Sequence, residues 1–180
     1  MDYLFNNSVG IKLNADQVAQ EAIDFINADE NCNYKIIIGT DSQAAADKTA
    51  DFVTAIVIYR VGNGGRYFWR RIANDKKFHT LRNRIWQEAL MSLDIAKQFI
   101  ESLQKISHDE LVLSAGIDME EHPVSKLSDR VDFEIHIDVG ENGATKAIIQ
   151  ELVGMVRANN FGVKTKPDSY AASKVADRHV

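Results

Sequence analysis

The first half of the chain shows two different spacings of apolar residues. A 3.6-residue period over about residues 15–28, after a capping-box pair at Asn14 and Gln17, predicts an amphipathic helix. Residues 1–11 show no period and are expected to be irregular. The β-branched run that opens residues 35–42 predicts a buried strand, so the chain begins with a helix followed by a strand.

The next two segments extend this first strand into a meander. Residues 52–61 are apolar on both faces, as expected for a strand in the centre of a sheet. The sequence of residues 62–65, Gly-Asn-Gly-Gly, tolerates positive φ angles and predicts a hairpin turn. Residues 66–73 follow as a third strand. We therefore expect three consecutive antiparallel strands.

The second half of the chain is predicted to alternate strands with helices. Its elements are a long amphipathic helix at 80–104, strands at 111–117 and 133–139, a helix at 144–159, a short strand at 163–166 and a last helix ending near Arg178. A meander followed by a long helix and strand–helix units predicts an α/β fold, a mixed sheet with helices on both faces.

Length and composition limit the kinds of protein this can be. The 180 residues fit one domain, and Cys32, the single cysteine, excludes an intramolecular disulfide and an all-cysteine zinc site. No signal peptide is apparent, and no apolar run approaches the ~18 residues that a membrane span requires. We expect a cytoplasmic protein without a membrane segment, and composition says nothing of its oligomeric state.

Charge is distributed unevenly along the chain. The net charge is −5, which by itself argues against a nucleic-acid partner. Residues 60–84, however, contain eight basic residues and one acid, a local charge of about +7 that leaves about −12 for the rest. This basic segment has the character of a surface for phosphates, or else of a solvated hairpin and helix start.

Asp41 is the clearest candidate for chemistry. It follows Ile36, Ile37 and Ile38 on a strand that is otherwise apolar, and it shares a strand face with Ile37. A carboxylate in that position lowers stability unless it is paired, hydrogen-bonded or bound to metal. The alternative is that Asp41 only caps the turn after the strand, together with Ser42.

Asp138 is a similar candidate, an acid on a later predicted strand. Glu134, His136 and Asp138 alternate with apolar residues and share one face, and Gly140 leaves space for a ligand just beyond. Polar residues on the wet face of an edge strand would give the same pattern.

Three further acids are weaker candidates. Glu88 lies near the boundary of the apolar stripe of the long helix, and Asp177 lies late in the last helix, where Lys174 offers an ordinary ion pair. Asp118 follows the predicted strand at 111–117 within an acid-rich stretch. Each of them is also compatible with a solvated surface position.

The chain resembles a family of largely uncharacterised bacterial proteins described as ribonuclease-H-like. Three segments carry the resemblance: Ile38-Gly-Thr-Asp41-Ser-Gln43, Ile135-His-Ile-Asp138-Val-Gly140 and Ser169-Tyr-Ala-Ala-Ser-Lys-Val-Ala-Asp177-Arg178. It covers most of residues 34–179 and leaves the N-terminal helix outside that core, within a single domain of residues 1–180. The combination of segments is more specific than any one of them.

The resemblance implies a ribonuclease-H-like fold and a carboxylate site. It assigns Asp41 to the first strand, Glu88 to the first helix, Asp138 to the fourth strand and Asp177 to the C-terminal helix. The predicted strand at 111–117 departs from this pattern. If it were the fourth strand, Asp118 would take the place of Asp138.

The implied function is metal-dependent hydrolysis of phosphodiester bonds in RNA, RNA–DNA hybrid or structured DNA. Mg²⁺ or Mn²⁺ would be held by Asp41, Asp138 and Asp177, with Glu88 binding metal or orienting water. The predicted contacts to the nucleic-acid backbone are basic residues, with His79 beside them: Arg70, Arg71, Lys76, Lys77 and Arg82.

Other functions fit the same fold, because a fold does not decide a reaction. One is a nucleic-acid-binding module without catalysis, in which Tyr67 and Trp69 could stack on bases. Another is a protein-interaction scaffold. The fold also occurs in ATP-handling proteins, and Asp138 to Thr145 resembles their phosphate-binding turn, but the chain has no GxxxxGK[ST] loop.

Overall fold

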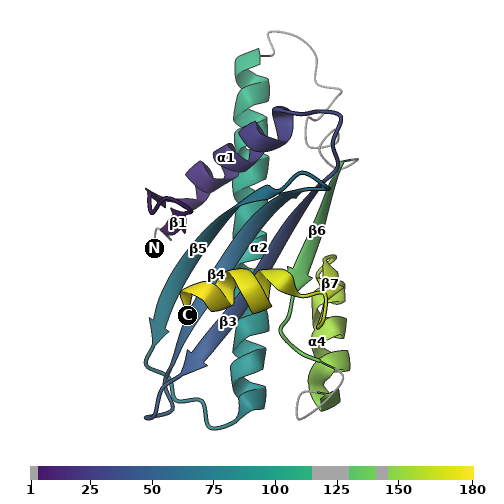
Figure 1. Ribbon diagram of the computed structural model, residues 1–180. Coiled ribbons are helices and arrows are strands. Elements are labelled where there is room, and N and C mark those ends of the chain that lie inside the picture. Colours follow the sequence, from purple (N-terminus) through teal and green to yellow (C-terminus); the bar gives the residue numbers. More distant parts are fainter. Residues whose placement is uncertain (1–3, 115–129, 141–145) are drawn as a thin grey trace.

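A computed structural model describes residues 4–114, 130–140 and 146–180 (Figure 1). The strands of these residues form one mixed sheet in the order β2-β1-β5-β4-β3-β6-β7. Their bounds are β1 Phe5–Asn7, β2 Lys12–Leu13, β3 Tyr34–Ala44, β4 Ala50–Arg60, β5 Gly65–Asn74, β6 Val131–His136 and β7 Gly162–Lys164. The helices are α1 Ala15–Asn27, α2 Leu81–Ser114 and α4 Lys146–Ala158. The chain therefore has the mixed α/β architecture that the sequence predicted.

The predicted meander is confirmed. β3 pairs with β4 antiparallel from Tyr34↔Arg60 to Ala44↔Ala50, and β4 pairs antiparallel with β5. Gly62 has a φ of 84° in the turn between β4 and β5, where a residue with a Cβ would be strained. The predicted capping box is also present at the start of α1.

The later strands extend the sheet on the other side of β3. β6 pairs parallel with β3, and β7 pairs parallel with β6 after the crossover through α4. Parallel neighbours place their carboxyl ends at the same edge of the sheet. The end of β6 therefore lies beside Gly39 of β3, close to Asp41.

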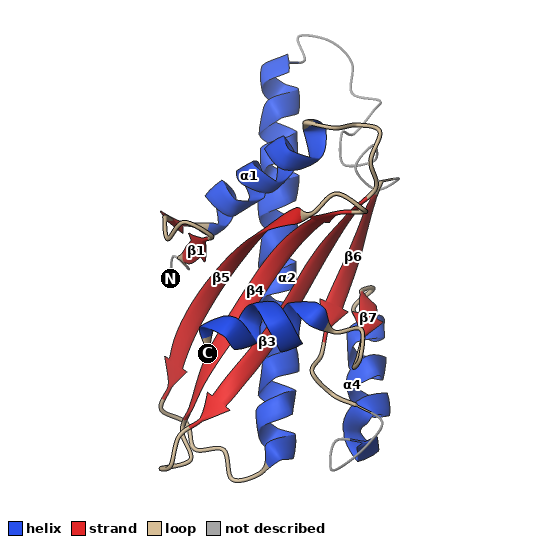
Figure 2. Ribbon diagram, viewed as in Figure 1, coloured by secondary structure: helices blue, strands red, loops and turns tan. Residues whose placement is uncertain are grey.

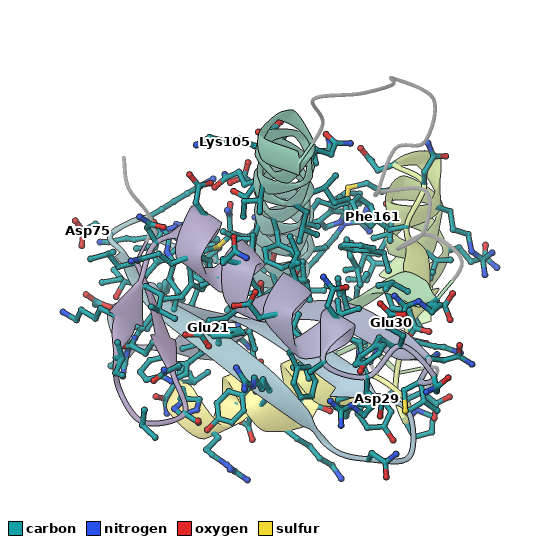
Figure 3. The ribbon with its side chains drawn as sticks, turned by 90° about the horizontal axis from the view of Figure 1, so that it is seen from above. Glu21, Asp29, Glu30, Asp75, Lys105 and Phe161 are labelled. Atoms are coloured by element: carbon teal, nitrogen blue, oxygen red, sulfur yellow. The ribbon has the colours of Figure 1, made fainter. Side chains whose placement is uncertain are left out.

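Helices cover both faces of the sheet, as Figures 2 and 3 show. On one face, α1, α2 and α4 enclose the main core, in which Ile36 and Ile38 of β3 pack with Ile23, Phe99 and Leu152. On the other face lies a short helical segment at the end of the chain, in front of β3 and β4 in Figure 1. It consists of a π-helical stretch and a 3-10 turn, Ala171–Ala176 and Asp177–His179, which together we call the C-terminal helix.

Two sequence predictions about secondary structure were wrong. Residues 111–114 are not part of a strand, because α2 continues through Ser114. A short apolar run does not distinguish strand from helix, and extending a helix that has already formed costs little. Residues 1–11 are not wholly irregular: β1 pairs with Trp69 and Phe68 of β5, a long-range contact that leaves no period in the sequence.

The C-terminal helix lies very close to the sheet because both sides present small residues. Ala171 packs on Ile37 and Val57, and Ala176 packs on Val53. Gly39 makes the closest approach: a Cβ at that position would lie 2.6 Å from the backbone nitrogen of Ala172. The absence of a side chain at Gly39 therefore sets the distance between the helix and β3.

We predict that Gly39→Ala destabilises the protein by about 1–3 kcal/mol, the usual result of overpacking a filled interior. The methyl group would meet the backbone of the C-terminal helix, which cannot rotate away as a side chain could. Chemical denaturation of both proteins measures the difference. Gly154→Ala is the control, because an added Cβ there meets nothing within 4 Å and should stabilise α4 by up to about 1 kcal/mol. Equal stability of Gly39→Ala and wild type would contradict this account.

Candidate functional site

Asp41, within β3, and Asp138, just beyond the end of β6, occupy equivalent places along two adjacent parallel strands. In the pairing of β3 with β6, Gly39 lies opposite His136. Asp41 lies two residues after Gly39, and Asp138 lies two residues after His136. Alternation along a strand puts them on the same face as Gly39 and His136, the face covered by the C-terminal helix. Two carboxylates from distant parts of the sequence therefore lie next to each other.

The environment of Asp41 is unusually unfavourable for a charge. Burial raises the pKa of Asp41 to about 6, and the negative charges of Asp138 and Asp177 raise it further. A hydrogen bond from the backbone of Ser42 and the guanidinium of Arg84 act in the opposite direction. The structure thus brings Asp41, Asp138 and Asp177 within electrostatic range of one another.

Asp177 is brought to this group by the docking of the C-terminal helix. The backbone N–H of Ala171 donates a hydrogen bond to Nδ1 of buried His136 at 3.3 Å. Because Nδ1 accepts, Nε2 carries the proton and donates to Glu134 at 3.2 Å. Lys35 in turn lies 2.6 Å from Glu134. Burial lowers the pKa of His136, which favours this neutral form, so a buried polar network helps to fix the helix that carries Asp177.

Glu88 approaches from the other face of the sheet. It projects from α2, is 5% exposed, and accepts a hydrogen bond of 2.5 Å from the hydroxyl of Ser42. Burial raises the pKa of Glu88 to about 8, and the charges of Asp41 and Asp138 add to the effect. Ser42 and Arg84 lower it in part. Glu88 is therefore a buried acid close to the aspartates but separated from them by the end of β3.

Hydroxyl groups line the interior beside Glu88. Thr54 and Thr40 share a hydrogen bond of 2.8 Å, Ser92 donates to Thr40 at 2.8 Å, and the same Ser92 hydroxyl lies 3.0 Å from the carbonyl oxygen of Glu88. All three hydroxyl residues are buried. Their hydrogen bonds satisfy one another, so this polar layer ties β3 and β4 to α2 directly behind the aspartates.

Asp138 has one oxygen paired and one without a partner. Its Oδ2 lies 2.8 Å from the ammonium of Lys166, on the connection between β7 and the C-terminal helix. Its Oδ1 is buried and has no hydrogen-bond partner among the described residues. A buried carboxylate oxygen without a partner is unfavourable, so this atom is an available ligand.

These residues suit an open metal site rather than a closed one. Within residues 4–114, 130–140 and 146–180, no three Asp, Glu, His or Cys side chains converge closely enough to enclose an ion. Mg²⁺ does not need such a cage, since it keeps waters and uses one or two carboxylates with substrate phosphate. Hard carboxylate oxygens and the unpartnered Oδ1 of Asp138 fit that requirement. Asp41 and Asp138 could therefore hold a divalent ion.

The other predicted residues are placed less closely together. Asp118 lies outside the described residues, and the strand that would have made it an alternative to Asp138 begins as helix. Arg70 and Arg71 are neighbours on β5 and so project to opposite faces. Arg71 lies 2.6 Å from Asp51.

The remaining basic residues lie around the start of α2. Lys76 lies over the ring of Phe78, and Arg82 lies 2.6 Å from Glu151. The backbone N–H of Phe78 bonds to the carbonyl of Lys48, so this loop lies beside the β3–β4 turn. Lys77 and His79 belong to the same loop. Contact of these groups with a nucleic-acid backbone stays a prediction.

The aromatic residues of β5 are covered. His179 stacks on Trp69 with ring centroids 4.2 Å apart and an interplanar angle of 5°, and it lies 5.8 Å from the ring of Tyr67. Base stacking on Trp69 would require the end of the chain to move. This face therefore offers no open stacking platform.

Sequence reasoning missed two cations of the site. Arg84 donates to the carbonyl oxygen of Ser42 at 2.6 Å and to its hydroxyl at 3.1 Å. Its spacing of four residues before Glu88 places both on one face of α2, a signal that could have identified it. Lys166 had no comparable signal, because its contact with Asp138 depends on where the connection after β7 lies.

We predict that the Glu88 carboxyl group makes the free energy of unfolding fall as pH rises between about 5 and about 9. The folded protein keeps the Glu88 proton up to about pH 8, whereas the unfolded chain releases it near the ordinary value of 4.5. In that window the folded state binds more protons, so stability decreases with pH, by on the order of a few kcal/mol in all. Asp41 contributes in the same direction from 3.8 up to about 6.

Urea unfolding of wild type and Glu88→Gln at several pH values measures this effect. The variant should lose the part of the decrease that lies above about pH 6, where Asp41 no longer contributes, and should be more stable than wild type at pH 9. Parallel stability curves for the two proteins would show that Glu88 does not carry a raised pKa.

Comparison with known proteins supports the fold. The model of the family described as "Ribonuclease H-like" matches residues 17–180. The chain is 31% identical over 177 residues to the uncharacterized protein YkuK of Bacillus subtilis (strain 168), covering 98% of this chain and 96% of the relative. No solved structure matches. Among the described helices, none is long and apolar enough to cross a membrane.

The family match begins within α1 and therefore includes part of the helix that sequence reasoning placed outside the core. It spans the meander, α2, β6, α4 and the C-terminal helix, and so includes Asp41, Glu88, Asp138 and Asp177. This protein belongs to the ribonuclease H-like family.

Proposed function

We propose that this protein is a divalent-metal-dependent nuclease that hydrolyses phosphodiester bonds in RNA, RNA–DNA hybrid or structured DNA. The observation that carries the proposal is the gathering of Asp41, Asp138, Asp177 and Glu88 at the end of β3. They come from four elements and from both faces of the sheet. Like charges at this distance repel one another, so the group would not be favoured for stability alone. A bound cation would offset that repulsion.

Each carboxylate has a role that follows from its position. Asp41 and Asp138, on adjacent strand ends, would hold the ion, and Asp177 would complete a second position on the side of the C-terminal helix. Glu88, behind the strand and hydrogen-bonded to Ser42, would bind metal or orient the attacking water. Bound Mg²⁺ or Mn²⁺ would supply charge stabilisation and a more acidic water.

The basic groups near the start of α2 are the proposed contacts to the phosphate backbone. Arg84 lies beside Asp41 and Glu88, and the loop that carries Lys76 and Lys77 is bonded to the β3–β4 turn at the same end of the sheet. An extended polyanion crossing that end would meet cations on its way to the carboxylates. This arrangement supports a nucleic acid rather than a small phosphate as substrate.

The central experiment is a cleavage assay with labelled RNA, RNA–DNA hybrid, single-stranded DNA and four-way junctions, each with Mg²⁺, Mn²⁺ or chelator. Asp41→Asn should lower the rate by at least about a hundredfold, since even outer partners of metal sites contribute about 10–100-fold. The same substitution should raise stability above about pH 6, because it removes a carboxylate with a raised pKa.

Asp94→Asn is the matched control. Asp94 is an exposed aspartate on α2 that accepts a hydrogen bond from Gln98, and its replacement should leave cleavage unchanged. Metal-dependent products that vanish in Asp41→Asn and persist in Asp94→Asn would establish the nuclease. Salt-sensitive binding without products from any substrate would instead favour a non-catalytic nucleic-acid-binding module, and no binding at all would favour an interaction scaffold.

A further inference from the structure

The ion pair between Lys166 and Asp138 has no evident structural purpose beyond the site. Its two atoms are 2.8 Å apart, and Lys166 precedes the C-terminal helix by only a few residues. The backbone N–H of Lys166 donates to the carbonyl oxygen of Val139 at 2.8 Å, which fixes the residue beside the strand end. The backbone therefore holds Lys166 at the site independently of its side chain.

The ammonium of Lys166 lies in the field of three carboxylates. Hydrogen bonding to Asp138 raises the pKa of Lys166, and the charges of Asp138, Asp41 and Asp177 raise it further. The same three carboxylates are those proposed to bind a divalent ion. The Lys166 ammonium thus interacts with the aspartates that such an ion would contact.

The pair is also built so that it can separate. The side chain of Lys166 is 52% exposed, compared with 20% for Asp138. A lysine stem can swing into water without opening the core, and an ion pair with one exposed partner is weak. Asp138 is much less free to move, because the chain on either side of it is hydrogen-bonded to the neighbouring segment, Ile137 to Lys164 and Val139 to Lys166.

We propose that Lys166 is a built-in counter-ion, which neutralises Asp138 in the metal-free protein and gives up the carboxylate when a divalent cation binds. The inference rests on the proposed function, since it assumes that Asp138 is a metal ligand. Once released, the ammonium remains next to the bound ion at the open side of the site. There it is placed to contact a phosphate oxygen of the nucleic acid.

This mechanism makes a prediction that a purely structural ion pair does not. If Lys166 competes with the metal, removing its charge must strengthen metal binding. If the pair only holds the connection after β7 in place, removing it must weaken folding and leave metal affinity equal or lower. The sign of the change in affinity separates the two.

The experiment is calorimetric titration of the metal-free full chain with MnCl₂, for wild type and Lys166→Met. We expect the variant to bind Mn²⁺ about twofold to fivefold more tightly, the range that an exposed ion pair allows. Its melting temperature should also rise more than that of wild type on addition of saturating Mn²⁺. Neither readout requires nuclease activity.

Three further variants make the comparison specific. Lys166→Arg keeps the charge and should bind Mn²⁺ as wild type does. Lys164→Met removes an exposed positive charge from neighbouring β7 and should change affinity far less than Lys166→Met. Asp138→Asn should lose the binding.

The outcomes distinguish this inference from the proposed function. Binding that Asp138→Asn abolishes and Lys166→Met does not strengthen would overturn the counter-ion role alone. Binding by Lys166→Met where wild type shows none would support it. No binding by either protein, or binding that survives in Asp138→Asn, would overturn both the counter-ion role and the metal site on which it rests.

Discussion

Mutual repulsion among carboxylates is the constraint around which this structure is arranged. Burial raises the pKa values of Asp41 and Glu88 because it withholds water from them, and the charges of Asp138 and Asp177 raise the pKa of Asp41 further. A domain is stable by only about 5–15 kcal/mol, so such a group must be compensated locally. Arg84, Lys166 and the hydroxyl of Ser42 provide that compensation in the described residues.

The C-terminal helix is the second requirement, because it delivers one of these carboxylates. Its closest approach to the sheet is that of Ala172 to Gly39, which has no side chain, and it is held by the hydrogen bond from Ala171 to His136. Its π-helical stretch places an extra residue in the turn, a distortion often found at functional sites. The packing of alanines against the sheet therefore both positions Asp177 and stabilises the fold.

The site is also divided by the sheet, which gives its acids different environments. Glu88 lies in a buried layer of hydroxyls on the side of α2, whereas the aspartates lie on the side that the C-terminal helix covers. Two carboxyl groups with different surroundings can hold different protonation states at the same pH. This separation is the physical basis for giving Glu88 a role distinct from that of Asp41.

The sequence was sufficient to predict the meander, the capping of α1 and the order of most elements, because hydrophobic period is a local signal, and to name four carboxylates as candidates. It could not determine where α2 ends, that β1 joins the sheet, or that Arg70 and Arg71 project apart. The tertiary structure alone shows that Asp41 of β3 lies beside the residues that follow β6, among them Asp138, and that Lys166 contacts Asp138. Those contacts join residues far apart in the chain, and their geometry depends on strand register and on the path of connections, which no local pattern records.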